Sequence, residues 1–203
     1  MAERNETGRP QPWPVIGQEH KGDFEIFSAR AIRARSPDDG SEYTFHIADA
    51  PDAVTVIAIT SNDELVMVRQ WRHPVQRVTL ETPSGIIDEG ETPEEAAARE
   101  LREETGYAGD DPECIGCVVL NPSWQTTRVY ATVVRNARRA GERDLDEGED
   151  TRVCLLKLGE VRRRVLEGEI DTSSVVAALA LWDWRTGATG AGAGGENRGA
   201  ENR

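Results

Sequence analysis

Apolar and β-branched residues gather in short runs along the chain, and these runs predict a strand-rich fold. The runs cover residues 42–47, 53–60, 64–71, 78–82, 114–120, 127–135 and 151–158. Each run alternates or is rich in β-branched residues, as is typical of strands. The polar turn Ser61-Asn62-Asp63 between the second and third runs predicts a hairpin.

A helical pattern is clearest over residues 93–104. Thr92 is a favoured N-cap, and Glu95, three residues later, completes a capping box with it. Pro93 suits the first helical position, and Gly106 supplies the left-handed residue that ends the helix. The apolar stripe that we expect to face a sheet consists of Ala96, Ala97 and Leu101.

Two later helices are predicted over residues 159–167 and 173–184. Many strands with few helices indicate an α+β fold or a mixed-sheet sandwich. The length of 203 residues suits one domain with modest additions. We expect residues 1–12 to be disordered and the Gly-rich residues 186–203 to form a flexible tail, because neither segment can bury much apolar surface.

The charge balance limits the possible partners. With 24 Lys and Arg against 37 Asp and Glu, the net charge is -13, so we expect no binding to bulk nucleic acid. A phosphate-containing ligand would need a metal ion or local arginines to invert the field at its site. No apolar run approaches the roughly 18–20 residues that span a bilayer, and the start of the chain lacks the apolar segment of a secretory signal. The expected location is therefore cytoplasmic, with no membrane partner.

Three cysteines are too few for a disulfide framework, and an odd number cannot all be paired. Cys114 and Cys117 have CxxC spacing, which can mean zinc or redox chemistry, but no second pair of ligands accompanies them. We expect buried free thiols.

Acidic residues concentrate on the helix predicted over residues 93–104. Glu103 and Glu104 follow Glu100 by three and four residues, so all three carboxylates share one face and repel one another unless a cation neutralises them. Oxygen ligands without nearby His or Cys favour Mg²⁺ or Mn²⁺. The alternative is an acidic helix face that is simply exposed to solvent.

The surrounding residues favour the metal site. Positions 85–107 fit the pattern GX5EX7REUXEEXGU, in which U is a bulky apolar residue, through Gly85, Glu91, Arg99, Glu100, Leu101, Glu103, Glu104, Gly106 and Tyr107. This segment resembles the box that defines the Nudix hydrolase family. The resemblance implies an α/β/α sandwich around a mixed sheet, in which the box forms a loop–helix–loop.

The same resemblance implies roles for the residues of the box. Glu100 and Glu104 would be the main metal ligands, Glu103 a ligand or a base, and the backbone carbonyl of Ser84 a further ligand. Arg99 would orient the carboxylates by ion pairing, and Glu91 would brace the packing of loop and helix. The ion would bridge the diphosphate of a substrate.

The flanking residues bear on the substrate. Residues 68–72 (VRQWR) and 80–85 (LETPSG) resemble the VRQYR and LELPAG context of ADP-ribose and nucleotide-sugar pyrophosphatases, with mild departures at Trp71, Thr82 and Ser84. This implies substrate contacts for Arg69 and Arg72, the latter with a planar fork that can clamp phosphate. A surface cation is the alternative for Arg72. Glu81 would bind a base or ribose, or serve as a structural ion-pair partner.

Two further segments enter the predicted site. Residues 121–130 resemble the NP…NR segment of bacterial nucleoside-diphosphate-sugar hydrolases, so Arg128 would contact diphosphate or sugar, and Trp124 would stack on the ligand or anchor the loop. In the acidic run 146–150, Glu149 is the first choice and Glu147 the second for the general base or an extra metal ligand. A solvated charge run is the alternative.

We therefore expect a metal-dependent pyrophosphohydrolase that splits ADP-ribose or another nucleoside diphosphate sugar into a nucleoside monophosphate and a sugar phosphate. The alternatives are a non-catalytic binder of nucleotide sugars and a housecleaning nucleoside triphosphate pyrophosphatase. Residues 51–185 would form the hydrolase domain. Residues 13–50 resemble the N-terminal sheet extension with which related pyrophosphatases complete each other's sites, which implies a homodimer.

Overall fold

The structure is a computed structural model, and it describes residues 10–145, 148 and 150–187. The chain divides into two compact units. The N-terminal unit holds the residues up to Asp52 together with Val119–Arg128, and the larger unit holds Ala53–Val118 and the residues from Val129 onward. The sequence-based division into residues 13–50 and 51–185 remains a prediction.

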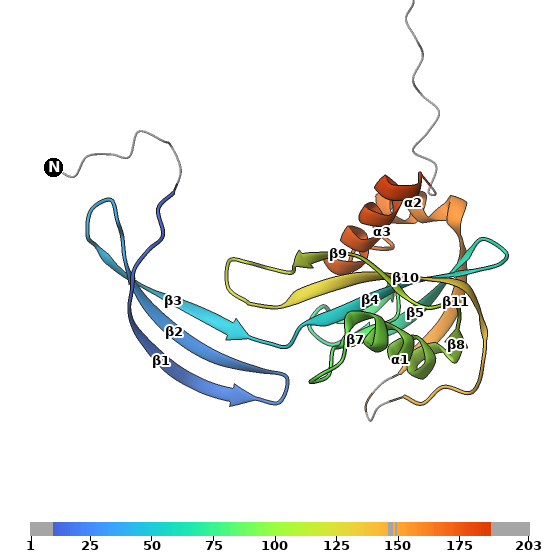
Figure 1. Ribbon diagram of the computed structural model, residues 1–203, viewed down its shortest axis with the longest axis horizontal. Coiled ribbons are helices and arrows are strands. Elements are labelled where there is room, and N and C mark those ends of the chain that lie inside the picture. Colours follow the sequence, from blue (N-terminus) through green and yellow to red (C-terminus); the bar gives the residue numbers. More distant parts are fainter. Residues whose placement is uncertain (1–9, 146–147, 149, 188–203) are drawn as a thin grey trace, which may run out of the picture. The chain divides into compact units, whose positions relative to one another are not determined.

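The N-terminal unit contains an antiparallel sheet of three strands in the order β1-β2-β3 (Figure 1). The strands are β1 (Val15–Phe24), β2 (Phe27–Arg35) and β3 (Glu42–Asp49). A tight hairpin joins the first two, with Phe24 paired to Phe27 and their rings stacked at a centroid distance of 4.7 Å. The strand expected over residues 42–47 is confirmed as part of β3.

The larger unit is built on a mixed sheet of eight strands. Its main path runs β11-β5-β4-β10-β8, with β6 beside β5, β7 beside β4 and β9 beside β10. The strands are β4 (Ala53–Thr60), β5 (Glu64–Arg72), β6 (Arg77–Glu81), β7 (Ser84–Ile86), β8 (Tyr107–Ala108), β9 (Glu113–Val119), β10 (Arg128–Arg139) and β11 (Thr151–Lys157). The pair β4–β10 is parallel, whereas β4 is antiparallel to β5 and β7.

Helices cover both faces of this sheet, because its central strands are apolar on both sides (Figure 1). The helices are α1 (Pro93–Thr105), α2 (Leu158–Leu166) and α3 (Ser173–Thr186). On one face, Val54 and Val56 of β4 join a buried cluster with Leu101 of α1. On the other face, Ile57 of β4 joins a cluster that includes Val161 of α2. The expected α/β/α sandwich is confirmed.

The predicted elements of the larger unit all appear, with ends shifted by a few residues. The hairpin at Ser61-Asn62-Asp63 joins β4 to β5, and Asp63 adopts φ 55° in the turn. All three cysteines are free, as expected, but Cys117 is exposed and Cys114 and Cys154 are only half-buried, so the expectation of buried thiols was wrong. In β9, which holds Cys114 and Cys117, only Ile115 is fully buried, so this strand does not enclose its two thiols.

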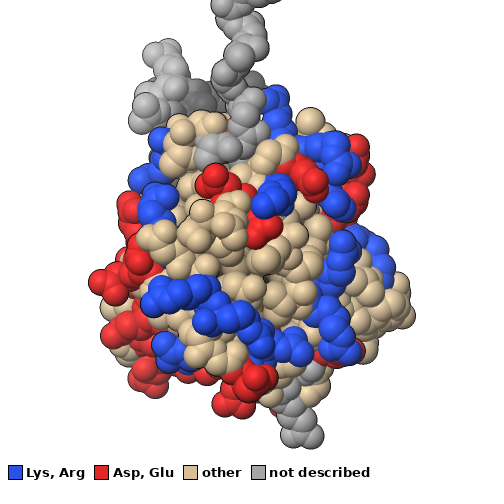
Figure 2. Space-filling view, turned by 90° about the vertical axis from the view of Figure 1, so that its right-hand side faces the viewer, with Lys and Arg blue, Asp and Glu red and all other residues tan. Residues whose placement is uncertain are grey.

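Charge on the surface is mixed. Figure 2 shows one face of the molecule, on which Lys and Arg side chains gather in clusters beside Asp and Glu side chains. Local basic clusters thus coexist with the net charge of -13. In the described part of the chain, no helix is long and apolar enough to cross a membrane.

Candidate active site

The loop and helix that carry the acidic residues begin where β7 ends. In the loop, the carboxylate of Glu91 accepts a hydrogen bond from the backbone N–H of Asp88 at 3.1 Å. The helix then starts at a complete capping box, in which Thr92 and Glu95 bond each other's backbone N–H groups. Gly106, at φ 71°, ends α1. These local bonds fix the direction in which the side chains of α1 leave the helix.

Arg99 is the centre of the charge network on α1. Its guanidinium donates two hydrogen bonds to Glu91, both at 2.9 Å, and one at 2.9 Å to the backbone carbonyl of Ile86. It also donates to Glu100 at 2.7 Å and to Glu103 at 3.2 Å. The hydrogen bonds to Glu91 are the main reason why the pKa of Arg99 is raised, so the guanidinium stays charged. Arg99 thereby offsets the repulsion among three carboxylates and holds them in place.

Two of the glutamates lie against the backbone that leads into the loop. Glu104 is 3% exposed, and its carboxylate accepts a hydrogen bond from the N–H of Ser84 at 3.0 Å. Glu100 lies over Gly85, where an added Cβ would be 2.0 Å from Oε1 of the carboxylate. The structure therefore brings Ser84, Glu100 and Glu104 together, with Glu103 and Arg99 at their side.

The donor set fits a hard divalent ion. Within the described residues, no three His, Cys, Asp or Glu side chains are already drawn close enough together to hold a metal. Carboxylate oxygens nevertheless converge on the Ser84–Gly85 backbone from one turn of α1, and Glu100 occupies a space that any side chain at position 85 would fill. Carboxylate and carbonyl oxygens are the ligands that Mg²⁺ and Mn²⁺ prefer.

The pair Arg72 and Glu81 forms a second polar cluster at the ends of β5 and β6. Arg72 donates to the two carboxylate oxygens of Glu81 at 3.0 and 2.8 Å, and the hydroxyl of Thr79 donates to Glu81 at 2.6 Å. Burial raises the pKa of Glu81, but the hydrogen bonds from Arg72 and Thr79 outweigh it and hold this pKa below its ordinary value. Of the two roles expected for Glu81, these contacts favour the structural ion-pair partner.

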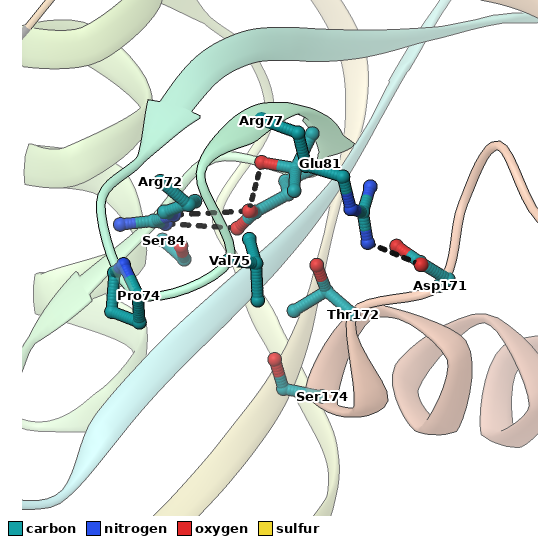
Figure 3. Close-up of a pocket in the computed structure, with 10 residues that line it drawn as sticks. Arg72, Pro74, Val75, Arg77, Glu81, Ser84, Asp171, Thr172 and Ser174 are labelled. Carbon is teal, nitrogen blue, oxygen red and sulfur yellow. Dashed lines mark hydrogen bonds and ion pairs between the residues drawn. The ribbon is translucent and has the colours of Figure 1, made fainter.

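A cavity of about 370 Å³ opens beside this pair (Figure 3). Its described lining comes from the β5–β6 hairpin, from Ser84 and from the start of α3, namely Arg72, Pro74, Val75, Arg77, Thr79, Glu81, Ser84, Asp171, Thr172 and Ser174. Sequence analysis missed the contribution of α3. The available signal was the polar run Asp171-Thr172-Ser173-Ser174 at the start of a predicted helix.

A second cavity, of about 420 Å³, shares Arg72 and Pro74 with the first. Gly148 and Asp150 of the acidic run also line it. Glu147 and Glu149, the residues predicted as base or extra ligand, lie outside the described residues, so their role remains a prediction.

The other predicted substrate residues are not among the residues that line these two cavities. Arg69 lies exposed on β5, opposite Arg152 of β11. Trp124 and Arg128 belong to the N-terminal unit, where Trp124 is 50% exposed and the N–H of Arg128 donates to Asp52 at 2.9 Å. Their contacts with a substrate stay predictions.

Comparison with known proteins decides the family. The model of the NUDIX domain matches residues 49–179. The chain belongs to the Nudix family. The box from Gly85 to Tyr107 lies inside the matched range, and the expected enzyme class, a Nudix hydrolase, is confirmed. Nudix hydrolases generally use divalent metal ions, in agreement with the oxygen donors of α1.

The alignments with individual relatives cover most of this chain. It is 32% identical to the methanol dehydrogenase activator of Bacillus methanolicus over 160 residues, which cover 76% of this chain and 86% of that relative. It is 31% identical to the ADP-ribose pyrophosphatase of Bacillus subtilis (strain 168) with the same coverage. A crystal structure of an ADP compounds hydrolase superposes with a TM-score of 0.77 at 23% identity, covering 88% of this chain and 97% of that one, which shows the shared fold.

Proposed function

We propose that this Nudix hydrolase cleaves the diphosphate of ADP-ribose or another nucleoside diphosphate sugar. The products are a nucleoside monophosphate and a sugar phosphate. The observation that carries the proposal is the convergence of Glu100 and Glu104 on the Ser84–Gly85 backbone, at the edge of a cavity that Arg72 lines. The relatives that are named ADP-ribose pyrophosphatase support the choice of substrate class.

Glu100, Glu104 and the carbonyl of Ser84 would hold a divalent ion, which we take to be Mg²⁺ or Mn²⁺. Such an ion supplies positive charge that polarises a phosphoryl group and neutralises the diphosphate. Arg99 keeps Glu100 and Glu103 oriented, since its guanidinium donates hydrogen bonds to both. Arg72, itself held by Glu81, offers a fixed cation to the diphosphate.

Hydrolysis also needs a base that takes a proton from the attacking water. As the water oxygen bonds to one phosphorus, the bond from that phosphorus to the bridging oxygen breaks, and the leaving phosphate keeps the electron pair. Glu149 is our first choice of base, with Glu147 and Glu103 as the other carboxylates. Support for the acidic run comes from its neighbours Gly148 and Asp150, which line the cavity that also contains Arg72.

We also propose a cytoplasmic homodimer that associates through the N-terminal unit. That unit exposes several large apolar side chains, namely Trp13, Val15, Phe24, Ile26, Tyr43 and Phe45. Trp13 packs its ring against Tyr43 and Phe45 at centroid distances of 5.5 and 5.7 Å, so part of this apolar surface is contiguous. Exposed contiguous apolar patches mark interaction sites. Sedimentation velocity should give twice the monomer mass of 22.4 kDa.

The direct test is to incubate the protein with ADP-ribose and either Mg²⁺ or Mn²⁺ and to separate the products by chromatography. AMP and ribose phosphate should appear in equal amounts and should be absent when a chelator is added. Glu104→Gln should lower turnover by several orders of magnitude with little change in thermal stability. Release of inorganic pyrophosphate from nucleoside triphosphates alone would instead identify a housecleaning enzyme.

A regulatory role is a second candidate, because the 32% identical relative is named as an activator of another enzyme. A pure regulator would bind ADP-ribose in calorimetry without cleaving it. The ordered network of Arg99 with Glu91, Glu100 and Glu103 favours catalysis, since binding alone does not require clustered carboxylates.

A further inference from the structure

Two of the three carboxylates of the proposed site, those of Glu103 and Glu104, lie in the last turn of α1. The last four carbonyl groups of a helix have no partner within the helix, so a final turn frays unless other groups bond them. Fraying here would move Glu104, which is 3% exposed and bonded to the N–H of Ser84. The geometry of the site therefore depends on the groups that hold this turn.

The chain at the end of β10 supplies partners for these carbonyls. The guanidinium of Arg139 donates a hydrogen bond to the carbonyl of Thr105 at 3.1 Å. The N–H groups of Ala140 and Gly141 donate to the carbonyl of Gly106 at 2.8 and 3.2 Å. A side chain and two backbone groups from a distant part of the sequence thus bond the end of α1.

Residues 139–144, which we call the capping segment, also reach the carboxylate-bearing residues themselves. The N–H of Asp144 donates to the carbonyl of Glu103 at 3.0 Å. That carbonyl belongs to the peptide unit that joins Glu103 to Glu104, and a peptide unit is planar. The hydrogen bond therefore fixes the plane from which the side chain of Glu104 leaves the helix.

Arg143 ties the capping segment to the sheet. Its guanidinium donates to the carbonyl of Thr151 at 2.8 Å and to the hydroxyl of the same residue at 3.2 Å. Thr151 is the first residue of β11 and is fully buried. Because Arg143 directly precedes Asp144, two consecutive residues connect a buried point of the sheet with the carbonyl of Glu103. The sheet thereby opposes movement of the end of α1.

We propose that Arg139 and Arg143 are positioning residues of the active site, which hold Glu103 and Glu104 in place through the capping segment. Neither arginine needs to touch the substrate. They keep the last turn of α1 helical and so keep the carboxylate of Glu104 at the backbone of Ser84. The proposal deepens the proposed function and rests on it, since these carboxylates serve there as metal ligands or as a base.

The test measures the binding of Mn²⁺ alone, by calorimetry, and the exchange of backbone amide hydrogens in α1. Arg139→Met and Arg143→Met remove a guanidinium but keep an unbranched apolar side chain. In both variants the amides of residues 103–106 should exchange at least about three times faster, while those of residues 96–99 keep their rates. Direct partners of metal ligands contribute about 10- to 100-fold to metal affinity, so these more remote residues should contribute about three- to tenfold.

Three further variants serve as controls. Arg143→Lys keeps the charge and a donor, so it should bind Mn²⁺ more tightly than Arg143→Met does. Arg138→Met should change neither measurement, because Arg138 is exposed and successive side chains of a strand point to opposite faces. Val161→Ala opens a cavity in the cluster on the other face of the sheet. It should lower the midpoint of thermal unfolding and leave Mn²⁺ affinity unchanged, which separates positioning from loss of stability.

The outcomes are distinct from those that test the hydrolase activity. Faster exchange and weaker Mn²⁺ binding in both methionine variants, with the controls as expected, support the positioning roles. Unchanged Mn²⁺ affinity in both, or an equal loss in Val161→Ala, overturns them. A wild-type protein that binds Mn²⁺ but cleaves no nucleoside diphosphate sugar refutes the proposed function and leaves the positioning roles standing. If one methionine variant does not fold, the other and Arg143→Lys still decide the matter.

Discussion

Gly85 and Glu100 are so close that a Cβ on the glycine would lie 2.0 Å from a carboxylate oxygen of the glutamate. The loop that leads into α1 and the carboxylate that leaves α1 thus share one space. Only a residue without a side chain at position 85 lets Glu100 reach the backbone beside Ser84. A conformational requirement does not explain this glycine, since Gly85 is not among those with positive φ.

Gly85→Ala should separate activity from stability. The atoms that a methyl group meets are the far end of a flexible side chain, so the fold can adapt by moving Glu100. We expect kcat/KM for ADP-ribose to fall at least about 100-fold, because displaced active-site groups are costly. The midpoint of thermal unfolding should change little. Gly159→Ala is the control, since a Cβ there meets nothing within 4 Å, and an equal loss of activity in both variants would contradict the explanation.

Arg99→Lys should raise the concentration of Mg²⁺ that is needed for activity. Lysine keeps the charge, but its single ammonium cannot bond Glu91, Glu100 and Glu103 at the geometry of the guanidinium. The loss of a group that orients metal ligands costs about 10- to 100-fold in metal affinity or activity. A titration of activity with Mg²⁺ should show half-maximal activity at a correspondingly higher concentration. An unchanged titration with reduced maximal activity would mean that Arg99 acts on the substrate instead.

Glu81→Gln should lower the free energy of unfolding near pH 7 by about 1–2 kcal/mol. The effect is this small because the side chain of Arg72 is 41% exposed, so solvent screens its ion pair with Glu81. The folded pKa of Glu81 lies below the ordinary value of 4.5, so ionisation of this carboxylate favours the folded state. That contribution is complete above 4.5 and is lost as the pH falls through the folded pKa. Urea unfolding at several pH values should therefore show the gap between wild type and variant closing in acid. If the difference in unfolding free energy did not change with pH, protonated Glu81 would stabilise the fold as much as ionised Glu81 does.

Gly106→Ala should destabilise the fold more than Gly90→Ala. Both glycines have positive φ, 71° and 88°, so alanine at either position costs about 1–2 kcal/mol in backbone strain. A Cβ at Gly106 would also lie 2.5 Å from the backbone carbonyl oxygen of Gly141, whereas at Gly90 it meets nothing within 4 Å. The difference between the two midpoints of urea unfolding measures this contact. Equal midpoints would show that the segment at Gly141 moves away freely.

The parts of the molecule that local chemistry determines were accessible from the sequence. The helix α1 carries its own start and stop signals, and the box fixes the spacing of Arg99, Glu100 and Glu104 whatever the surrounding fold. The central strands were recognisable because they are apolar on both faces. The strands β1 and β2 were not predicted one by one. The first is mostly exposed, the second is mostly half-buried, and both contain charged residues, so neither shows a clear alternation of apolar and polar positions.

The missed features depend on long-range packing. Asp171 and Thr172 lie about ninety residues after Glu81, and no local pattern indicates that the start of α3 meets the β5–β6 hairpin. The burial of Cys117 was misjudged for a similar reason, since a strand-like run does not tell which of its faces a helix will cover. Whether Glu81 binds a ligand or an arginine was open in the sequence and depends on Thr79 and Arg72 being close to it.

The parallel pairing of β4 with β10 has a consequence for synthesis of the protein. The hydroxyl of Thr132 reaches the carbonyl of Thr55, 77 residues earlier in the chain. Until β10 has left the ribosome, β4 can pair with β5 and β7 but keeps one hydrogen-bonding edge open, with the fully buried Val54, Val56 and Ile57 beside it. An open apolar edge recruits other strands. The nascent chain therefore passes through a stage in which it is prone to aggregation, and that stage ends only when β10 is added.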